Sequence, residues 1–245
     1  MTDEVIKSLL PTPERLEELA QKSAGEFLEA QPYSHVVIDE FLDAAVITKL
    51  LDEFPSPEDK RWGLHKHQNS DKLACGEDEF LGPFTGQLVR EMNSARFLKF
   101  LESLSGIVGL IPDAWLVGAG LHQIERGGFL EVHADFNYHP LWKLDRRLNL
   151  LLYLNPDWQD EYGGHLELWD SEMRACVNRI SPVANRLVIF RATDVSYHGH
   201  PTPLNCPPGQ TRKSMAMYYY SNGRPLEETS TTHSTLYQQR PQAKI

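Results

Sequence analysis

Three residues in the second half of the chain could together hold a metal ion. His133 and Asp135 form an H-A-D motif in a run rich in strand-forming residues. Side chains at positions i and i+2 of a strand point to the same face, so this motif places an imidazole beside a carboxylate. His198, which follows the apolar run 187–190, is the best candidate for a third ligand. Two histidines and one carboxylate with open coordination positions suit non-haem Fe(II).

The H-A-D motif taken alone has a plainer explanation. His133 and Asp135 could form a surface pair and His198 could be a loop residue, because short motifs often match by chance. Commoner catalytic signatures are absent from the sequence: it has no GxSxG motif and no P-loop, and the GxG that begins at Gly118 does not continue into a dinucleotide fingerprint. These absences remove the commonest hydrolase, Rossmann and NTPase signatures.

A second polar group follows His198 along the chain. Arg212 and Ser214 open the strongly strand-forming run R-K-S-M-A-M-Y-Y-Y and would share one face of that strand. A guanidinium binds a carboxylate through two parallel hydrogen bonds, and a serine hydroxyl can add a third. The pattern therefore predicts a site for a carboxylate near the candidate metal ligands.

These motifs occur in a fixed order over about residues 115–221, which is under half of the chain. They are H-A-D at 133–135, R-L-N-L-L-L-Y-L-N at 147–155, G-G-H-L-E-L at 163–168, N-R-L-V-I-F at 185–190, His198, and R-K-S at 212–214. The ordered set resembles the prolyl-hydroxylase-like branch of the Fe(II)/2-oxoglutarate oxygenases. The resemblance implies a mainly β fold with α-helices: a double-stranded β-helix, or jelly-roll barrel, flanked by N-terminal helices.

The same resemblance implies cofactors and roles for individual residues. The cofactors would be Fe(II) and two co-substrates, 2-oxoglutarate and dioxygen. The iron ligands would be His133, Asp135 and His198. The 2-oxoglutarate site would comprise Arg212 and Tyr153 on the distal carboxylate, Ser214 beside them, Leu166 in the pocket wall, and Gln123 near the metal-bound end.

Substrate contacts are expected from the loop after the H-A-D motif and from the mouth of the barrel. The candidates are Asn137, Tyr138, Trp142, Arg126 and His200. For each of them a structural role is the alternative. Asn137, Tyr138 and Trp142 could form a rigid surface loop, Arg126 could pair with a surface carboxylate, and His200 could occupy a loop position. Arg146 and Arg147 precede a core strand and are interpreted as structural.

The implied reaction is hydroxylation of an unactivated C–H bond, coupled to decarboxylation of 2-oxoglutarate to succinate; desaturation stays open. The favoured substrate is a small molecule such as an amino acid or biosynthetic intermediate. A peptidyl prolyl or other side-chain hydroxylase is the alternative. A zinc-holding cupin-like barrel or a ligand-binding barrel is the rival of a different class. The presence of Arg212 together with Tyr153 favours the oxygenase over the zinc-holding barrel, because a zinc hydrolase needs no buried arginine aimed at a dicarboxylate.

The elements that position these residues can be read from periodicity. Helices are predicted at 12–28 and 43–54, one or two helices at 84–104, a strand at 33–38, and a long loop at 55–80. Short strands follow at 115–124, 128–133, 147–154, 164–169, 174–180, 186–191 and 212–220. We expect one domain over residues 1–245, with a helical part at 1–110, a barrel core at about 114–221 and a polar tail at 225–245.

Composition sets the remaining limits. Apolar residues make up 41% of the 245 residues, and 24 Lys and Arg against 34 Asp and Glu give a net charge of −10. An acidic chain without a basic stripe is not expected to bind nucleic acid or an anionic membrane. Three separated cysteines exclude a disulfide framework, and the N-terminal stretch MTDEVIKSLL has no apolar run typical of a signal peptide. We therefore expect a cytoplasmic protein; whether it forms a homodimer stays open.

Overall fold

The computed structural model describes residues 8–241, apart from the side chains of residues 65–67 and 78. Parts of the expected N-terminal stretch and of the polar tail, residues 1–7 and 242–245, lie outside this range. The helices are α1 (Pro13–Glu29), α2 (Ala44–Glu53), α3 (Pro83–Met92) and α4 (Ala95–Ser105), with short 3-10 turns at Asp78–Phe80, Asp160–Tyr162 and Leu226–Glu228.

The strands begin after the first helix and dominate the second half of the chain. They are β1 (His35–Ile38), β2 (Gly63–His67), β3 (Ser70–Cys75), β4 (Ile111–Pro112), β5 (Gly120–Ile124), β6 (Leu130–Ala134), β7 (Asp145–Tyr153), β8 (Leu166–Trp169), β9 (Cys176–Ile180), β10 (Leu187–Arg191), β11 (His198–His200), β12 (Arg212–Ser221) and β13 (Leu236–Tyr237). The predicted strands from residue 115 onward match β5 to β10 and β12. The short strand β11, which carries His198, was not predicted.

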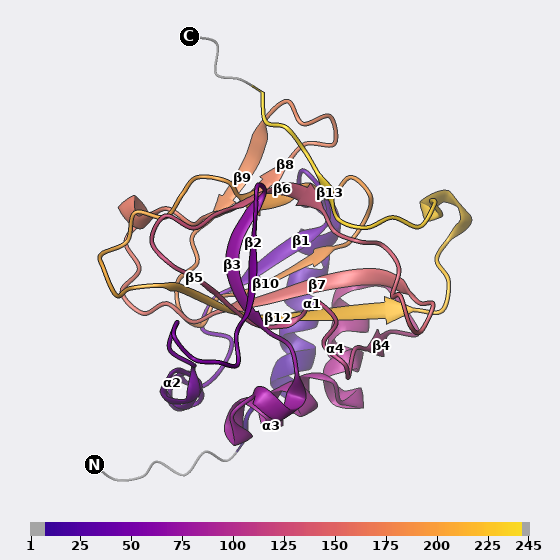
Figure 1. Cartoon of the computed structure of the whole chain (residues 1–245). Helices are drawn as coiled ribbons and strands as arrows, with labels where there is room; N and C mark the ends of the chain where they lie inside the picture. Colours follow the sequence, from indigo (N-terminus) through magenta and orange to yellow (C-terminus); the bar gives the residue numbers. More distant parts are fainter. Residues whose placement is uncertain (1–7, 242–245) are drawn as a thin grey trace.

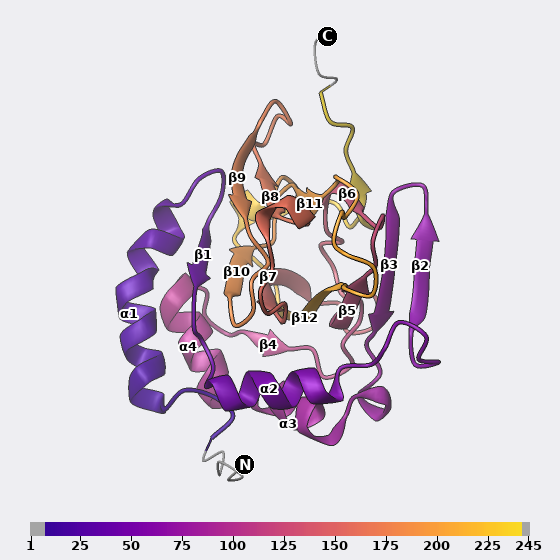
Figure 2. The ribbon, with the colours of Figure 1, turned by 90° about the vertical axis from the view of Figure 1, so that its left-hand side faces the viewer.

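All strands pair antiparallel in one curled sheet with the order β1-β10-β7-β12-β5-β3-β6-β11-β8-β9. Strands β2, β4 and β13 lie off this path, on β3, β12 and β6. The long strands β7 and β12 cross the middle of the molecule (Figure 1), and the sheet curls so that β8 and β11 face β5 and β12 across an interior (Figure 2). The arrangement brings strands that are distant in sequence around one enclosed space.

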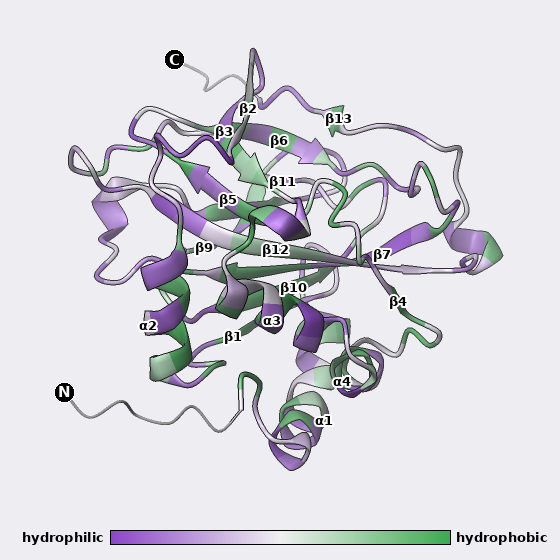
Figure 3. Cartoon of the chain, turned by 60° about the horizontal axis from the view of Figure 1, so that its bottom comes forward, coloured by the Kyte–Doolittle hydropathy of each residue, from purple (hydrophilic) through white to green (hydrophobic). Residues whose placement is uncertain are grey.

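The four helices support the sheet from outside. Figure 2 shows α1 beside α4 along one flank and α2 with α3 beneath the strands. Thr12 and Asp43 cap the N-termini of α1 and α2 by accepting hydrogen bonds from the backbone N–H groups of Arg15 and Ala45. The helices are banded in polar and apolar colour because only one helix face is buried, while β10 is mostly apolar (Figure 3).

The core between the helices and the sheet is aromatic and aliphatic. Phe97 of α4 packs against Phe41, Phe100 and Tyr219 with ring centroids 5.4–6.3 Å apart. The Tyr219 hydroxyl donates to the Met92 carbonyl oxygen, which ties β12 to the end of α3. No helix in the described part of the chain combines the length and the apolar character needed to cross a bilayer.

Residues 55–80 differ from the expected loop. They contain the β2–β3 hairpin, whose inner strand β3 pairs with β5 through Leu73↔Gln123 and Ala74↔His122. Leu73 and Cys75 are buried, but the neighbouring positions are polar, so the apolar alternation is too short to be recognised in the sequence. The hairpin closes one side of the curled sheet.

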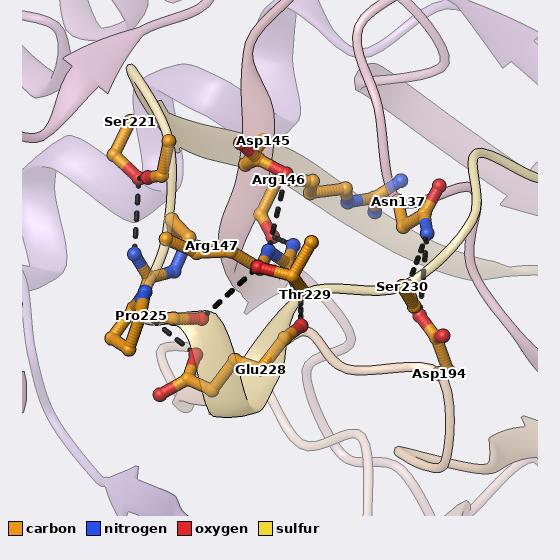
Figure 4. Close-up of polar contacts among 12 residues, drawn as sticks. Asn137, Asp145, Arg146, Arg147, Asp194, Ser221, Pro225, Glu228, Thr229 and Ser230 are labelled. Carbon is orange, nitrogen blue, oxygen red and sulfur yellow. Dashed lines mark hydrogen bonds and ion pairs between the residues drawn. The ribbon is translucent and has the colours of Figure 1, made fainter.

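The C-terminal segment is ordered against the sheet up to residue 241. The side chain of Arg147 donates to Ser221 and Glu228 at 3.1 Å, and the side chain of Asn137 donates to the Ser230 hydroxyl at 3.0 Å (Figure 4). Farther along, Leu236 and Tyr237 form β13 on the edge of β6. The polar tail therefore continues as a strap that returns to the strand bearing His133.

Glu53 joins α2 to α3 and gives a test of the helical layer. Its carboxylate accepts hydrogen bonds from the backbone of Phe84 and Thr85 and from the Thr85 hydroxyl at 2.8–3.0 Å. Burial favours a higher pKa for Glu53, but these hydrogen bonds outweigh it and hold the pKa below its usual value. The carboxylate therefore stabilises the fold above its unfolded-state pKa, and this stabilisation is lost as the pH falls through the lowered folded-state pKa.

We expect Glu53→Gln to lower the free energy of unfolding by about 1 kcal/mol at neutral pH, after allowing for solvent screening. The difference from the unchanged protein should shrink in acid, as urea unfolding at several pH values would show. Asp52→Asn, one residue away and exposed, is the matched control and should have little effect. An equal loss in both variants, or a loss independent of pH, would contradict this role of Glu53.

Candidate active site

His133, Asp135 and His198 meet at one end of the interior. Their ligand atoms lie within 4.8 Å of one another. Nε2 of His133 is 3.5 Å from one carboxylate oxygen of Asp135, and Nε2 of His198 is 3.4 Å from the other. His133 lies on β6 and faces its register partner His198 on β11, while Asp135 directly follows β6. The arrangement could hold a divalent metal ion.

Both imidazoles are oriented for metal binding by their second ring nitrogen. Nδ1 of His133 lies 2.8 Å from the Glu131 carbonyl oxygen, and Nδ1 of His198 lies 2.9 Å from that of Ser196. A carbonyl oxygen only accepts, so each Nδ1 carries the proton and each Nε2 keeps a free lone pair. Burial lowers the pKa of His198 to about 4, so this ring is neutral at ordinary pH. A neutral imidazole is the form that binds a metal.

Asp135 is held in its charged form by two neighbours on β7. Oδ2 of Asp135 accepts from the Arg146 guanidinium at 3.0 Å and from the Asn149 amide at 2.6 Å. Burial favours a higher pKa for Asp135, but Arg146 and the two histidines outweigh it and hold the pKa well below its usual value. The carboxylate is thus ionised before any metal arrives.

Arg146 was interpreted from sequence as structural only, but it contacts the metal-site carboxylate directly. Its guanidinium carbon lies 3.4 Å from the ring centroid of Tyr218 and 4.5 Å from that of Phe136. Its Nε donates to the Asn149 side chain at 2.7 Å. The side chain is fully buried, so it is a fixed positive charge directly behind Asp135.

Arg212 enters the same interior from the start of β12. Its Nε donates to the Gly164 carbonyl oxygen at 2.7 Å and one terminal nitrogen donates to the Tyr153 hydroxyl at 3.2 Å. Gly164 has φ of +71°, and a Cβ there would lie 2.9 Å from Cδ of Arg212. Glycine at position 164 therefore leaves room for this arginine.

Other predicted residues also line this cavity. Ser214, Leu166 and His200 face it together with Arg212 and the metal triad. His200 is buried and neither of its ring nitrogens has a hydrogen-bond partner among the described residues. Tyr153 is not a lining residue; it is fully buried and supports Arg212 from behind.

The remaining expected co-substrate residue, Gln123, does not reach the cavity. Its side chain donates to the Pro55 carbonyl oxygen and accepts from the Thr211 hydroxyl at 3.0 Å. On β5 the neighbours His122 and Ile124 line the cavity, so strand alternation turns Gln123 to the opposite face. The residue expected near the metal-bound end is therefore one position out of register with the cavity face of β5.

Four of the predicted substrate residues lie outside the cavity as well. Asn137 binds the C-terminal segment, and Arg126 donates to Cys206 and Asn205 in a neighbouring loop. Trp142 stacks on His139 with ring centroids 4.8 Å apart. Tyr138 lines a separate surface hollow with residues 232–235. None of these four lines the cavity of the metal triad, whereas His200 does.

Sequence reasoning missed several lining residues, namely Lys72, His122, Asn149 and Tyr218. His122 pairs with the predicted residue Ser214 across β5 and β12. Asn149 and Tyr218 lie four residues from the predicted Tyr153 and Ser214 on β7 and β12, so strand alternation places them on the same faces. Lys72 lies in the hairpin that was expected to be a loop, and no sequence signal identified it.

The family comparison agrees with this geometry. Residues 119–220 match the family model described as the 2OG-Fe(II) oxygenase superfamily, a span that contains the triad, Arg212 and Ser214. This part of the chain is therefore similar to the superfamily. Fe(II) and 2-oxoglutarate are the cofactors of such oxygenases, and a triad with free Nε2 lone pairs and an ionised carboxylate fits the metal.

A curated relative places the chain near the prolyl hydroxylases of the superfamily. Prolyl 3-hydroxylase OGFOD1 of Mus musculus is 28% identical over 179 residues. The match covers 70% of this chain but only 30% of that protein. The chain thus spans under a third of the length of this relative.

Solved structures support the fold. A Pseudomonas putida prolyl-4-hydroxylase has a TM-score of 0.56 at 15% identity, covering 83% of this chain and 100% of that one. A Trichoplax adhaerens prolyl hydroxylase, solved with a hypoxia inducible factor peptide fragment, has a TM-score of 0.56 at 19% identity, covering 85% and 91%. The predicted double-stranded β-helix with flanking helices is confirmed.

The contact between Asn149 and Asp135 can be tested by metal affinity. We expect Asn149→Leu to weaken Co(II) or Fe(II) binding by about 10- to 100-fold, because ligands lose affinity when their supporting hydrogen bonds are removed. Isothermal titration calorimetry of the purified protein measures this directly. Asn178→Leu on β9 is the control, since the Asn178 amide contacts His35 and not the triad. Equal metal affinity in both variants would show that this hydrogen bond does not support Asp135.

The attachment of the C-terminal segment can be tested separately. The Asn137 side chain bonds to Ser230, Thr231 and His233 at 3.0 Å. We expect Asn137→Ala to raise amide hydrogen exchange over residues 229–238 by about tenfold while the β7 and β12 amides stay protected, because local opening is cheaper than global unfolding. Asn222→Ala, exposed at the start of the segment, should leave exchange unchanged. Uniform acceleration across the sheet would instead mean that Asn137 supports the whole fold.

Proposed function

We propose that the chain is a hydroxylase in which His133, Asp135 and His198 hold Fe(II) and Arg212 binds the distal carboxylate of 2-oxoglutarate. One observation carries the proposal: a three-ligand group with open positions and a buried guanidinium face the same cavity. When bound, iron, 2-oxoglutarate and dioxygen supply an oxidant able to attack an unactivated C–H bond, with succinate and carbon dioxide as by-products.

The residues of the chain prepare this chemistry without taking part in the electron transfer. Arg212 is buried and its only described partners are neutral oxygens, those of Gly164 and Tyr153, so its charge is available to an anion. Tyr153 fixes the guanidinium against its ring, 4.9 Å from the centroid, and Ser214 offers a hydroxyl beside it. Leu166 and Phe190 give the cavity an apolar wall that limits water near the metal.

The substrate we propose is a small molecule such as an amino acid or biosynthetic intermediate. Lining residues from β3, β5, β6, β7, β8, β10, β11 and β12 surround the cavity, which supports a compact substrate enclosed by the sheet. A peptidyl prolyl residue is the second candidate, and the similarity to a prolyl 3-hydroxylase favours it. A zinc-holding or purely ligand-binding barrel gives no reason for Arg212 to lie in the same cavity.

The first test is anaerobic titration of the protein with Fe(II) and then 2-oxoglutarate, followed by visible absorption. Chelation of the metal by the keto acid should give a weak charge-transfer band that is absent in His133→Ala. Arg212→Ala should keep its metal affinity but bind 2-oxoglutarate about 10- to 100-fold more weakly, because removing hydrogen bonds to a charged group costs about 1.5–3 kcal/mol.

Arg126→Ala is the matched control, because Arg126 contacts the 205–206 loop outside the cavity. The band and its 2-oxoglutarate dependence should be unchanged in this variant. If iron binds but no band forms, Arg212 does not serve the co-substrate and a zinc or binding-only barrel becomes the better account. Oxygen- and 2-oxoglutarate-dependent gain of 16 mass units, about that of one oxygen atom, in candidate small molecules or prolyl peptides then separates the two substrate classes.

A further inference from the structure

Lys72 is a cavity residue that the proposed function does not use. It lies on β3, the inner strand of the hairpin, and faces the same interior as the triad and Arg212. By the β3–β5 register, in which Leu73 pairs with Gln123, Lys72 lies opposite the cavity residue Ile124. The backbone therefore directs this side chain inward, although most surface lysines point to water.

The Lys72 ammonium has no anionic partner. Among the described residues none accepts a hydrogen bond from it and none forms an ion pair with it. Burial lowers the pKa of Lys72, and Asp135 raises it while Arg146 lowers it, so these two are the charges it feels most. Oδ2 of Asp135 already accepts from Arg146 and Asn149 and lies beside His198, and Oδ1 lies beside His133. Lys72 thus lines the cavity of the metal triad without an ion-pair partner there.

The charges of the cavity do not balance without a further anion. Asp135 and the two carboxylates of bound 2-oxoglutarate would supply three negative charges, whereas Fe(II), Arg146, Arg212 and Lys72 would supply five positive charges. A desolvated positive charge is costly unless it is paired. The whole chain is acidic, with a net charge of −10, so these positive groups are a property of the cavity and not of the surface.

We propose that Lys72 is a specificity-determining residue that binds a carboxylate of the primary substrate. This inference rests on the proposed function and narrows it to small molecules in which a carboxylate lies a few bonds from the carbon that reacts. A peptidyl residue has no carboxylate of its own backbone to offer inside the cavity, whereas a free amino acid or a related acid does. The hairpin β2–β3 thus selects the substrate by charge.

Equilibrium binding to the anaerobic complex with Fe(II) and 2-oxoglutarate tests the proposal without turnover. The probes are cyclopentanecarboxylate and its uncharged isostere cyclopentanecarboxamide, and the readout is the change in the charge-transfer band on titration. The carboxylate should bind at least about tenfold more tightly than the amide. Lys72→Met should remove this preference, and Lys72→Arg should retain it. Lys49→Met, an exposed lysine on α2, removes one charge elsewhere and should leave the preference unchanged.

Each outcome has a distinct meaning. If carboxylate and amide bind the unchanged protein equally, or if Lys72→Met keeps the preference, Lys72 does not recognise a substrate anion. If Lys72→Met instead weakens 2-oxoglutarate binding with no separate carboxylate effect, Lys72 belongs to the co-substrate site and the proposal is overturned. Failure to form the band in the unchanged protein would refute the oxygenase function itself. Carboxylate and amide binding can then still be compared on the metal-free protein by calorimetry.

Discussion

The charged carboxylate of Asp135 is the constraint around which the rest of the site is built. An ionised carboxylate removed from water costs several kcal/mol unless a partner charge and hydrogen bonds compensate. Here the compensation comes from Arg146 and Asn149, both on β7. Arg146 in turn needs an enclosed place, which Tyr218 of β12 and Phe136 after β6 provide with their rings. One charge thereby fixes three strands relative to one another.

Strand alternation distributes the remaining groups. On β12, Arg212, Ser214 and Tyr218 share the cavity face, because side chains at alternate positions of a strand point to the same side. Close approach of strands adds a second requirement at Gly199, between the two histidines of β11. A Cβ at Gly199 would lie 2.8 Å from the Leu130 carbonyl oxygen, so only glycine lets β11 lie against β6 with both histidines inward.

The parts of the site that the sequence revealed are those that depend on local spacing. The i, i+2 rule was enough to pair His133 with Asp135 and Arg212 with Ser214, and strand periodicity located most of the sheet. The placement of Gln123 failed because a one-residue difference in register reverses the face of a strand. Lys72 was missed because the alternation in β3 is short and polar, and its inward direction is decided by pairing with β5, which is distant in sequence.

Residues with two roles were the other source of error. Arg146 looked structural because it precedes a core strand, and it is structural, but its partner is a metal-site carboxylate that lies 11 residues earlier in the chain. Asn137 looked like a substrate contact because it follows the H-A-D motif, and its amide instead binds a segment more than 90 residues later. Side-chain pairing over such separations leaves no pattern in a single sequence.

The short strand β13 has a consequence for the solution behaviour of the protein. Beyond the contact with β3 at Leu130, the outer edge of β6 is covered by Leu236, Tyr237 and the Gln238 amide, which donates to the Val132 carbonyl oxygen at 2.8 Å. An uncovered strand edge is a template for pairing with another chain. By covering this edge, the strap prevents the strand that carries His133 from pairing with a neighbouring molecule. The solubility of the protein is thereby linked to the integrity of its catalytic end.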